Sequence, residues 1–86
     1  MSSYHRWFES ACNEHDRGYG TCLKPKLDTD LEFYTNMMNS CASAFPSPGA
    51  GRSDCEATAQ TYASAVVMIG DRFYNDAQRA ACVCCE

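Results

Sequence analysis

The stretch between Cys12 and Cys22 holds a histidine directly beside a carboxylate, His15 and Asp16. An imidazole exchanges protons near neutral pH, and a carboxylate binds hard metal ions. Disulfides at the two cysteines could hold this stretch rigid, as an active site requires. A lone histidine on an apolar helix face is more often a core residue, so the functional interpretation depends on what else lies near His15.

A second carboxylate, Asp30, is predicted to lie close to His15. The connector between their two predicted helices is short, and helices joined in this way run antiparallel. A carboxylate bonded to one imidazole nitrogen fixes the tautomer and leaves the other nitrogen as a base. Asp28 is the competing candidate, on a different face of the same helix.

Apolar residues at helical spacing predict the two helices that position these groups. The first runs from Tyr4 to about Tyr19 and the second from about Asp28 to Ala44, with Pro25 in the connector. The stripe expected to be buried is Tyr4, Phe8, Ala11, Cys12, His15 and Tyr19 in the first helix, and Leu27, Leu31, Tyr34, Met38, Cys41 and Phe45 in the second.

Residues 45–52, rich in proline and glycine, predict a loop before a third helix. Ser53 and Glu56 have the spacing of a capping box at its start, and the helix is expected to reach about Phe73. Asn75 is predicted to cap a short last helix. Residues expected to be buried on the third helix are Ala59, Tyr62, Ala63, Val66, Ile69 and Phe73.

No segment alternates as a strand would, so the sequence predicts one all-α domain over residues 1–86, with three main helices and a short C-terminal one. A chain this small forms a marginal core, and its seven cysteines indicate disulfide staples in an oxidising compartment. Their spacing does not fit a zinc finger. We therefore expect a secreted protein and, because no leader sequence opens the chain, a mature form.

The net charge of −4 argues against nucleic acid as a partner. No apolar run reaches the ~20 residues of a transmembrane helix. Basic and aromatic residues in the first third suit a rim that contacts a membrane surface, although they also fit scattered solvated charges and core aromatics. These residues are Arg6, Arg17, Lys24, Lys26, Tyr4, Trp7 and Phe8.

The pattern Cys12-x-x-His15-Asp16-x-Gly18-Tyr19 resembles the active-site helix of the small secreted phospholipases A2 of fungi and bacteria. The similarity extends to Asp30 before Phe33-Tyr34 and to a weaker C-terminal pattern that ends at Cys84. It covers roughly residues 11–84 and implies a phospholipase A2-like helical domain, stapled by disulfides.

The resemblance implies calcium-dependent hydrolysis of the sn-2 ester of glycerophospholipids at a membrane surface. His15 would be the base that activates water, Asp30 would orient it, and Asp16 would bind Ca²⁺. Tyr19 and Tyr34 stand where hydroxyl groups could support the aspartate, or where they could simply pack.

The sequence departs from the family before His15. The family's calcium loop, with its glycine, its proline and a cysteine that pairs with the counterpart of Cys12, has no match in residues 1–10. Calcium takes about six to eight oxygen ligands, of which Asp16 supplies at most two. The resemblance therefore implies that Cys12 is the unpaired cysteine, and that the loop was cleaved off, lies on a second chain or has been replaced.

Three interpretations follow. The first is a phospholipase A2, a carboxylic ester hydrolase. The second is a weakly active or inactive phospholipase-like binding protein, such as a toxin or effector subunit, which the absent loop favours. The third is a stapled helical domain without catalysis, which the combined presence of His15, Asp16 and Asp30 disfavours.

Overall fold

The computed structural model describes residues 5–82, and the side chains of residues 7–82. This part of the chain forms four helices: α1 (His5–Tyr19), α2 (Lys26–Ala44), α3 (Ala50–Ile69) and α4 (Asp71–Ala81). It contains no strand. The all-α prediction, with three main helices and a short fourth, is confirmed.

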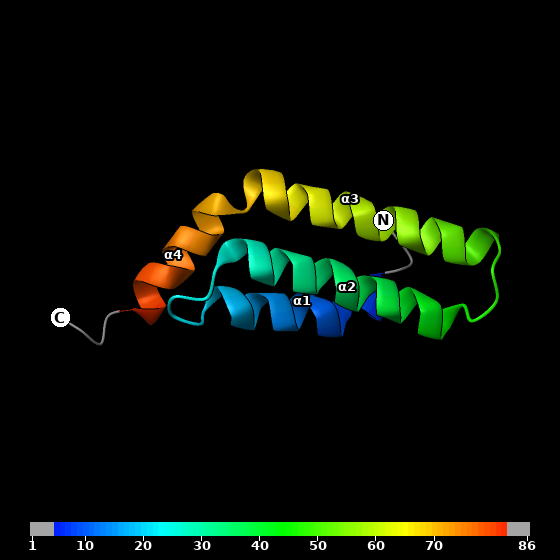
Figure 1. Cartoon of the computed structure of the whole chain (residues 1–86), viewed down its shortest axis with the longest axis horizontal. Coiled ribbons are helices and arrows are strands. Elements are labelled where there is room, and N and C mark those ends of the chain that lie inside the picture. Colours follow the sequence, from blue (N-terminus) through cyan, green and yellow to red (C-terminus); the bar gives the residue numbers. More distant parts are fainter. Residues whose placement is uncertain (1–4, 83–86) are drawn as a thin grey trace.

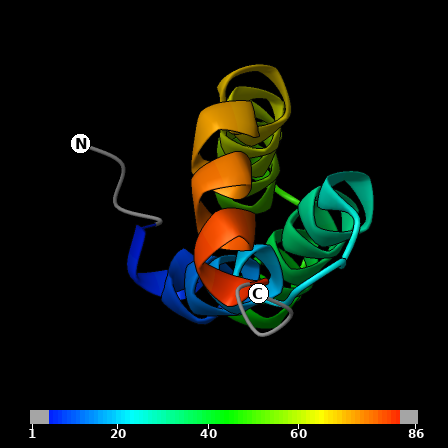
Figure 2. The same cartoon turned by 90° about the vertical axis from the view of Figure 1, so that its left-hand side faces the viewer.

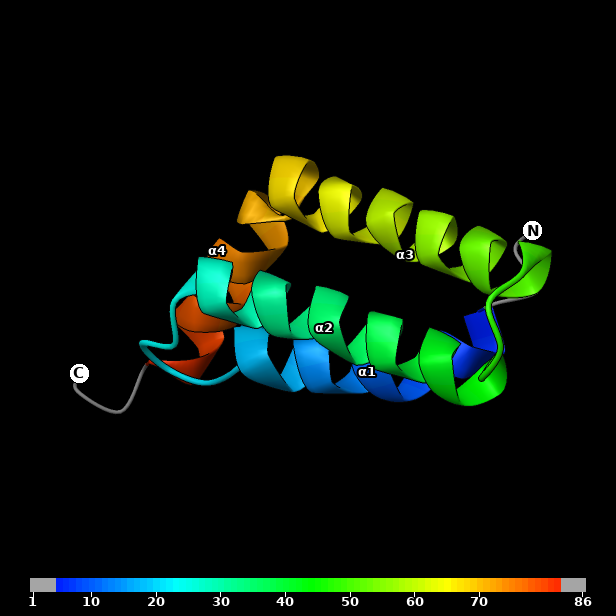
Figure 3. The same cartoon turned by 45° about the vertical axis from the view of Figure 1, so that its right-hand side comes forward.

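Helices α1 and α2 lie antiparallel and side by side, and α3 returns along α2 (Figure 1). Helix α4 then turns back across the end of the bundle towards the α1–α2 connector, as the end-on view shows (Figure 2). The core lies between the three long helices, with α2 packed against both of the others (Figure 3). Its buried residues are Phe8, Ala11, Phe33, Met37, Cys41, Cys55 and Ala59.

Two disulfides staple this small core. Cys41–Cys55 joins the end of α2 to the start of α3, and Cys22–Cys82 joins the α1–α2 connector to the end of α4. By the loop-entropy model, linking positions 14 and 60 residues apart stabilises a fold by about 3 and 4 kcal/mol. The longer link is the one that holds α4 against the end of α1.

Helix α2 begins at Lys26, two residues before the predicted start. Pro25 occupies the N-cap position with φ −62° and ψ 138°, so the proline that blocks a preceding helix also starts this one. This shift places Lys26 in the first turn, one helical turn before Asp30.

The capping box predicted at Ser53 is wrong. Helix α3 begins at Ala50, and the Ser53 N–H bonds the Gly49 carbonyl inside the first turn. A Cβ at Gly51 would lie 3.0 Å from the Phe45 ring, so the ring packs closely over this turn. The glycine that suggests a loop by composition is used here for close packing within a helix.

The third helix ends at Ile69 and not at Phe73, and Asn75 lies inside α4 instead of capping it. Gly70 forms the joint between α3 and α4: a Cβ there would collide with the Val66 carbonyl oxygen and lie 2.7 Å from the Tyr19 hydroxyl. The end of α3 is therefore fixed by a contact with α1, which local capping rules do not detect.

Several residues predicted to be buried are exposed. The buried face of α2 is Thr29, Asp30, Phe33, Met37 and Cys41. Leu27 and Leu31 from the predicted stripe are 62% and 56% exposed. Ile69 and Phe73, predicted to be buried on the third helix, are 69% and 65% exposed. The chain turns at Gly70, and in the last turn of α3 the side chains of Val67, Met68 and Ile69 stay largely exposed.

Two members of the predicted membrane rim lie elsewhere. Phe8 is fully buried in the core, and Lys26 is bonded to the buried carboxylate of Asp30. Tyr4, and the side chain of Arg6, lie outside the described part of the chain. Within that part, no helix combines the length and apolarity needed to cross a bilayer.

Candidate active site

His15 and Asp30 form a buried hydrogen-bonded pair between α1 and α2. The His15 Nε2 atom lies 2.7 Å from Asp30 Oδ1, and the two residues are 8% and 3% exposed. Because a carboxylate oxygen accepts, Nε2 carries the proton and Nδ1 is left as the basic nitrogen. The antiparallel arrangement predicted from the short connector thus brings the two residues together.

A close helix contact allows this distance. A Cβ at Gly18 would lie 2.5 Å from the Thr29 methyl group, so the end of α1 approaches the start of α2 more closely than any side chain would permit. Gly18 follows His15 by three residues, and Thr29 precedes Asp30. The glycine in the sequence motif thus sets the separation of the two functional side chains.

Two further hydrogen-bond donors contact the Asp30 carboxylate. The Tyr19 hydroxyl donates to Oδ1 at 2.8 Å, and Lys26 Nζ donates to Oδ2 at 2.6 Å. Burial alone would raise the pKa of Asp30, but the hydrogen bonds from Lys26, His15 and Tyr19 outweigh it and hold the pKa below its ordinary value. The carboxylate is therefore ionised at neutral pH.

Tyr19 is held in its neutral, donating form. Burial raises its pKa strongly, and the hydrogen bond to the Asp30 anion raises it further. Its ring and that of Phe33 also pack against the imidazole of His15, with centroids 4.2 and 4.6 Å away. The orientation of the imidazole is thus fixed by a hydrogen bond and by two aromatic neighbours.

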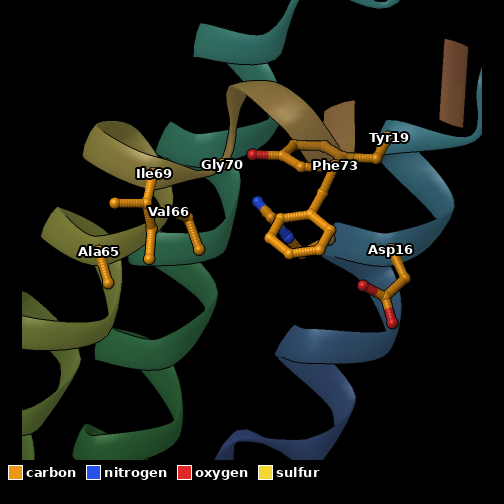
Figure 4. Close-up of a pocket in the computed structure, with 8 residues that line it drawn as sticks. Asp16, Tyr19, Ala65, Val66, Ile69, Gly70 and Phe73 are labelled. Atoms are coloured by element: carbon orange, nitrogen blue, oxygen red, sulfur yellow. The ribbon is translucent and has the colours of Figure 1, made fainter. Parts of the chain in front are cut away.

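A pocket of about 300 Å³ opens beside His15, between α1 and the joint of α3 and α4. Figure 4 shows Asp16 and Tyr19 of α1 on one side, apolar side chains of α3 on the other and Phe73 between them. The lining is His15, Asp16, Tyr19, Ala65, Val66, Ile69, Gly70 and Phe73. An imidazole base thus borders a largely apolar cavity, an arrangement that suits an ester with an apolar chain.

Asp16 lies at the edge of this pocket and is solvent-exposed. Among residues 5–82 no group of three or more histidine, cysteine, aspartate or glutamate side chains could hold a metal ion. Calcium takes about six to eight oxygen ligands. Clustered acidic side chains in this part of the chain therefore do not form a calcium site, although Asp16 could supply one carboxylate to it.

Among the described residues, neither of the other candidates forms a hydrogen bond with the His15–Asp30 pair. Asp28 is exposed at the start of α2, so Asp30 occupies the place beside His15 for which the two competed. Tyr34 is half-buried beside a second cavity, and within the described residues it donates no hydrogen bond to Asp30. Of the two tyrosines proposed to support the aspartate, Tyr19 makes that contact.

Cys12 is unpaired and half-buried one turn before Asp16. Burial raises the pKa of its thiol, and the Asp16 carboxylate raises it further. Cys84 and Cys85 lie outside the described residues.

Sequence reasoning missed the roles of Lys26 and Gln78. Gln78 donates to the Tyr19 and Thr21 carbonyls and accepts from the Leu23 N–H, all at 2.8 Å, and so docks α4 on the connector. The four-residue spacing from Lys26 to Asp30 was a visible signal of an ion pair. No local pattern points to the contacts of Gln78.

A family model described as group XII secretory phospholipase A2 precursor matches residues 6–86. The group XIIA secretory phospholipases A2 of Mus musculus and Homo sapiens are each 39% identical to this chain over 75 residues. These matches cover 85% of the chain but 39% and 40% of the mouse and human proteins, so the chain spans about two fifths of their length. No solved structure matches it significantly. Because the family model covers nearly the whole sequence, the chain belongs to the group XII secretory phospholipase A2 family.

Proposed function

We propose that the protein hydrolyses the sn-2 ester of glycerophospholipids, releasing a fatty acid and a lysophospholipid. The observation that carries this proposal is the buried His15–Asp30 pair beside an apolar pocket, in a chain of a phospholipase A2 family. The similarity of the His15-Asp16 motif to the fungal and bacterial enzymes supports the same activity.

His15 is the general base in this proposal. Its Nδ1 takes a proton from a water molecule, whose oxygen forms a bond to the ester carbonyl carbon. The bond between that carbon and the glycerol oxygen then breaks, and His15 returns the proton to the leaving oxygen. Asp30 holds the imidazole in the Nε2–H tautomer and stabilises the imidazolium formed on the way.

The pocket wall opposite His15 suits the acyl chain of a lipid. Ala65, Val66 and Ile69 present apolar side chains there, and transfer of methylene groups from water to such a wall is favourable by about 0.8 kcal/mol each. The ester would then lie between this wall and the imidazole.

We propose Ca²⁺ as the cofactor and Asp16 as one of its ligands. When bound, such an ion polarises the ester carbonyl and stabilises the oxyanion. No second acidic or histidine cluster among the described residues accompanies Asp16, so its remaining ligands would be carbonyl oxygens, water, or groups of a further segment or second chain.

We propose a phospholipid membrane surface as the partner and secretion as the destination. The relatives are named secretory enzymes, and the disulfides suit an oxidising compartment. The contact surface lies at the end of α3, where the side chains of Val67, Met68 and Ile69 are 51%, 78% and 69% exposed. Ile69 also lines the pocket, so a lipid bound at this surface is next to the base.

A second candidate function is that of a phospholipase-like binding protein without turnover, such as a toxin or effector subunit. The observation that favours it is the incomplete set of metal ligands among the described residues.

Fatty-acid release from phosphatidylcholine vesicles, with calcium and with a chelator, separates the two functions. Release that needs calcium, and that is lost in His15→Ala and Asp16→Asn, supports the hydrolase. Vesicle binding without release, by protein whose circular dichroism shows intact helices, supports the binding protein.

A further inference from the structure

Lys26 is a half-buried cation to which the proposed reaction gives no role. Its side chain is 16% exposed, and Nζ lies 2.6 Å from Asp30 Oδ2. The same nitrogen lies 2.9 and 3.5 Å from the Val66 and Val67 carbonyl oxygens and 3.6 Å from Asp71 Oδ1. One ammonium group thus connects the carboxylate of the candidate site to the last turn of α3.

Local helix energetics do not explain this lysine. Lys26 is the first residue of α2, where a cation opposes the helix dipole. A lysine that precedes its acidic partner by four residues is also the weaker order for an ion pair within a helix. Its position is therefore explained by its contacts with the buried Asp30 carboxylate and with the carbonyl groups of α3.

The Asp30 carboxylate needs a donor at each oxygen. Its side chain is 2% exposed; Oδ1 accepts from His15 and Tyr19, and Oδ2 accepts from Lys26. A buried carboxylate oxygen left without a donor is strongly unfavourable, so an Asp30 without Lys26 would turn or admit water. Either change loosens the bond from Oδ1 to His15.

The second set of contacts reaches the pocket wall. Val66 lines the pocket opposite His15, and its carbonyl oxygen accepts from Lys26 Nζ. Lys26 thereby joins Asp30, which holds the base, to the wall proposed to hold the acyl chain.

We propose that Lys26 is a positioning residue for the site: by occupying Asp30 Oδ2 it keeps Oδ1 directed at His15 and Tyr19, and it fixes the Val66 wall relative to that pair. Its effect on turnover rests on the proposed hydrolase function, whereas its effect on the His15–Asp30 bond does not.

The test compares Lys26→Met and Lys26→Arg with Lys24→Met, all in a His5→Gln background that leaves His15 as the one histidine. Lys24 is the matched control, because its Nζ pairs with Glu32 at 2.8 Å and does not reach Asp30. The readout is the rate at which the His15 Nε2–H proton exchanges with water, measured by nitrogen-15 NMR at one fixed pH.

We expect exchange to quicken by about tenfold or more in Lys26→Met, because the hydrogen bond that protects the proton is loosened. Lys24→Met should leave the rate unchanged, and Lys26→Arg, which retains a cationic donor, should recover at least part of the protection. A folded Lys26→Met protein with the exchange rate of the parent would overturn the proposal.

A double-mutant cycle decides the question if Lys26→Met is too unstable for NMR. Lys26 has two kinds of partner, the Asp30 carboxylate and the carbonyls of α3. We compare the loss in melting temperature caused by Lys26→Met in the parent protein and in the Asp30→Asn variant. If Lys26 acts through Asp30, the loss in the Asp30→Asn variant is smaller by several degrees. Additive losses would mean that Lys26 only caps α3, and would contradict the proposal.

Turnover of a short-chain, water-soluble phospholipid gives the kinetic readout. Lys26→Met should lower kcat more than it raises KM, because Asp30 acts on the imidazolium formed during the reaction. A parent protein that turns over no substrate would contradict the hydrolase function, while the exchange rate and the cycle would still decide the role of Lys26.

Discussion

Gly18 packs directly against the side chain of Thr29. A Cβ atom at Gly18 would lie 2.5 Å from the Thr29 methyl carbon, too close for any side chain. Thr29 itself is 1% exposed. This contact sets how closely α1 approaches α2, and thereby sets the 2.7 Å bond between His15 and Asp30.

We therefore expect Gly18→Ala to push the two helices apart. The added methyl group should destabilise the fold by about 1–3 kcal/mol, the usual effect of overpacking a core. Gly20→Ala is the matched control, because its Cβ would meet only ordinary contacts of 3.6 and 3.7 Å. Urea unfolding of both variants measures the difference, and equal stability would show that the Gly18 contact is not limiting.

Asp30→Asn should reduce kcat far more than Asp28→Asn. The amide can donate to His15 and so stabilise the wrong tautomer, a change that reduces kcat roughly 10⁴-fold in a histidine-aspartate system of this kind. Asp28 is exposed and lies apart from the imidazole. Rates measured on the same vesicles test this, and similar losses in both variants would contradict the assignment of Asp30 as the residue that orients His15.

The positions of α1 and α2 were predictable from local rules, which placed either Asp30 or Asp28 near His15; the resemblance to the secreted phospholipases A2 then favoured Asp30. Periodicity locates the two helices, and a short connector makes them antiparallel. The predicted buried stripe of α2 was nevertheless rotated, since Leu27 and Leu31 are exposed while Thr29 and Asp30 are buried. Polar residues that bond one another in a core are invisible to a pattern that counts apolar ones.

The end of α3 was not predictable, because it depends on residues distant in sequence. Gly70 lies beside the Tyr19 hydroxyl, and Gln78 of α4 bonds the backbone at Tyr19 and Thr21. The apolar run from Ala63 to Ile69 indicated a core segment, yet its last residues are exposed because α4 turns away. Tertiary contacts of this kind leave no periodic signal.

The exposed last turn of α3 should govern binding to lipid surfaces. Each large apolar side chain that enters a bilayer interface contributes up to about 1.5–3 kcal/mol, so Met68→Gln and Ile69→Gln should each weaken vesicle binding by roughly tenfold. Leu23→Gln is the control, because Leu23 is 85% exposed but lies on the α1–α2 connector.

Sedimentation with phosphatidylcholine vesicles measures this binding without any need for turnover. An equal effect of all three substitutions would point to nonspecific apolar adhesion. A parent protein that sediments as a dimer, together with a monomeric Met68→Gln variant of unchanged vesicle binding, would instead assign the surface to a second copy of the chain.

The Asp30 carboxylate also predicts how stability depends on pH. Its pKa in the folded protein is below its ordinary value because, despite its burial, Lys26, His15 and Tyr19 donate to the anion. A lowered folded-state pKa means that the unfolded chain binds the proton more readily. The stabilisation by Asp30 is therefore fully present above the unfolded-state pKa of about 3.9, and it is lost as the pH falls through the folded-state pKa.

Urea unfolding between pH 6 and pH 2 tests this dependence. The parent should lose stability across the lower part of the range, and Asp30→Asn should lose less, because its amide takes up no proton there. Asp28→Asn, which changes an exposed carboxylate on the same helix, should follow the parent. If the Asp30→Asn curve ran parallel to the parent curve, the carboxylate would not be held ionised by its three donors, and the electrostatic basis of the candidate site would fail.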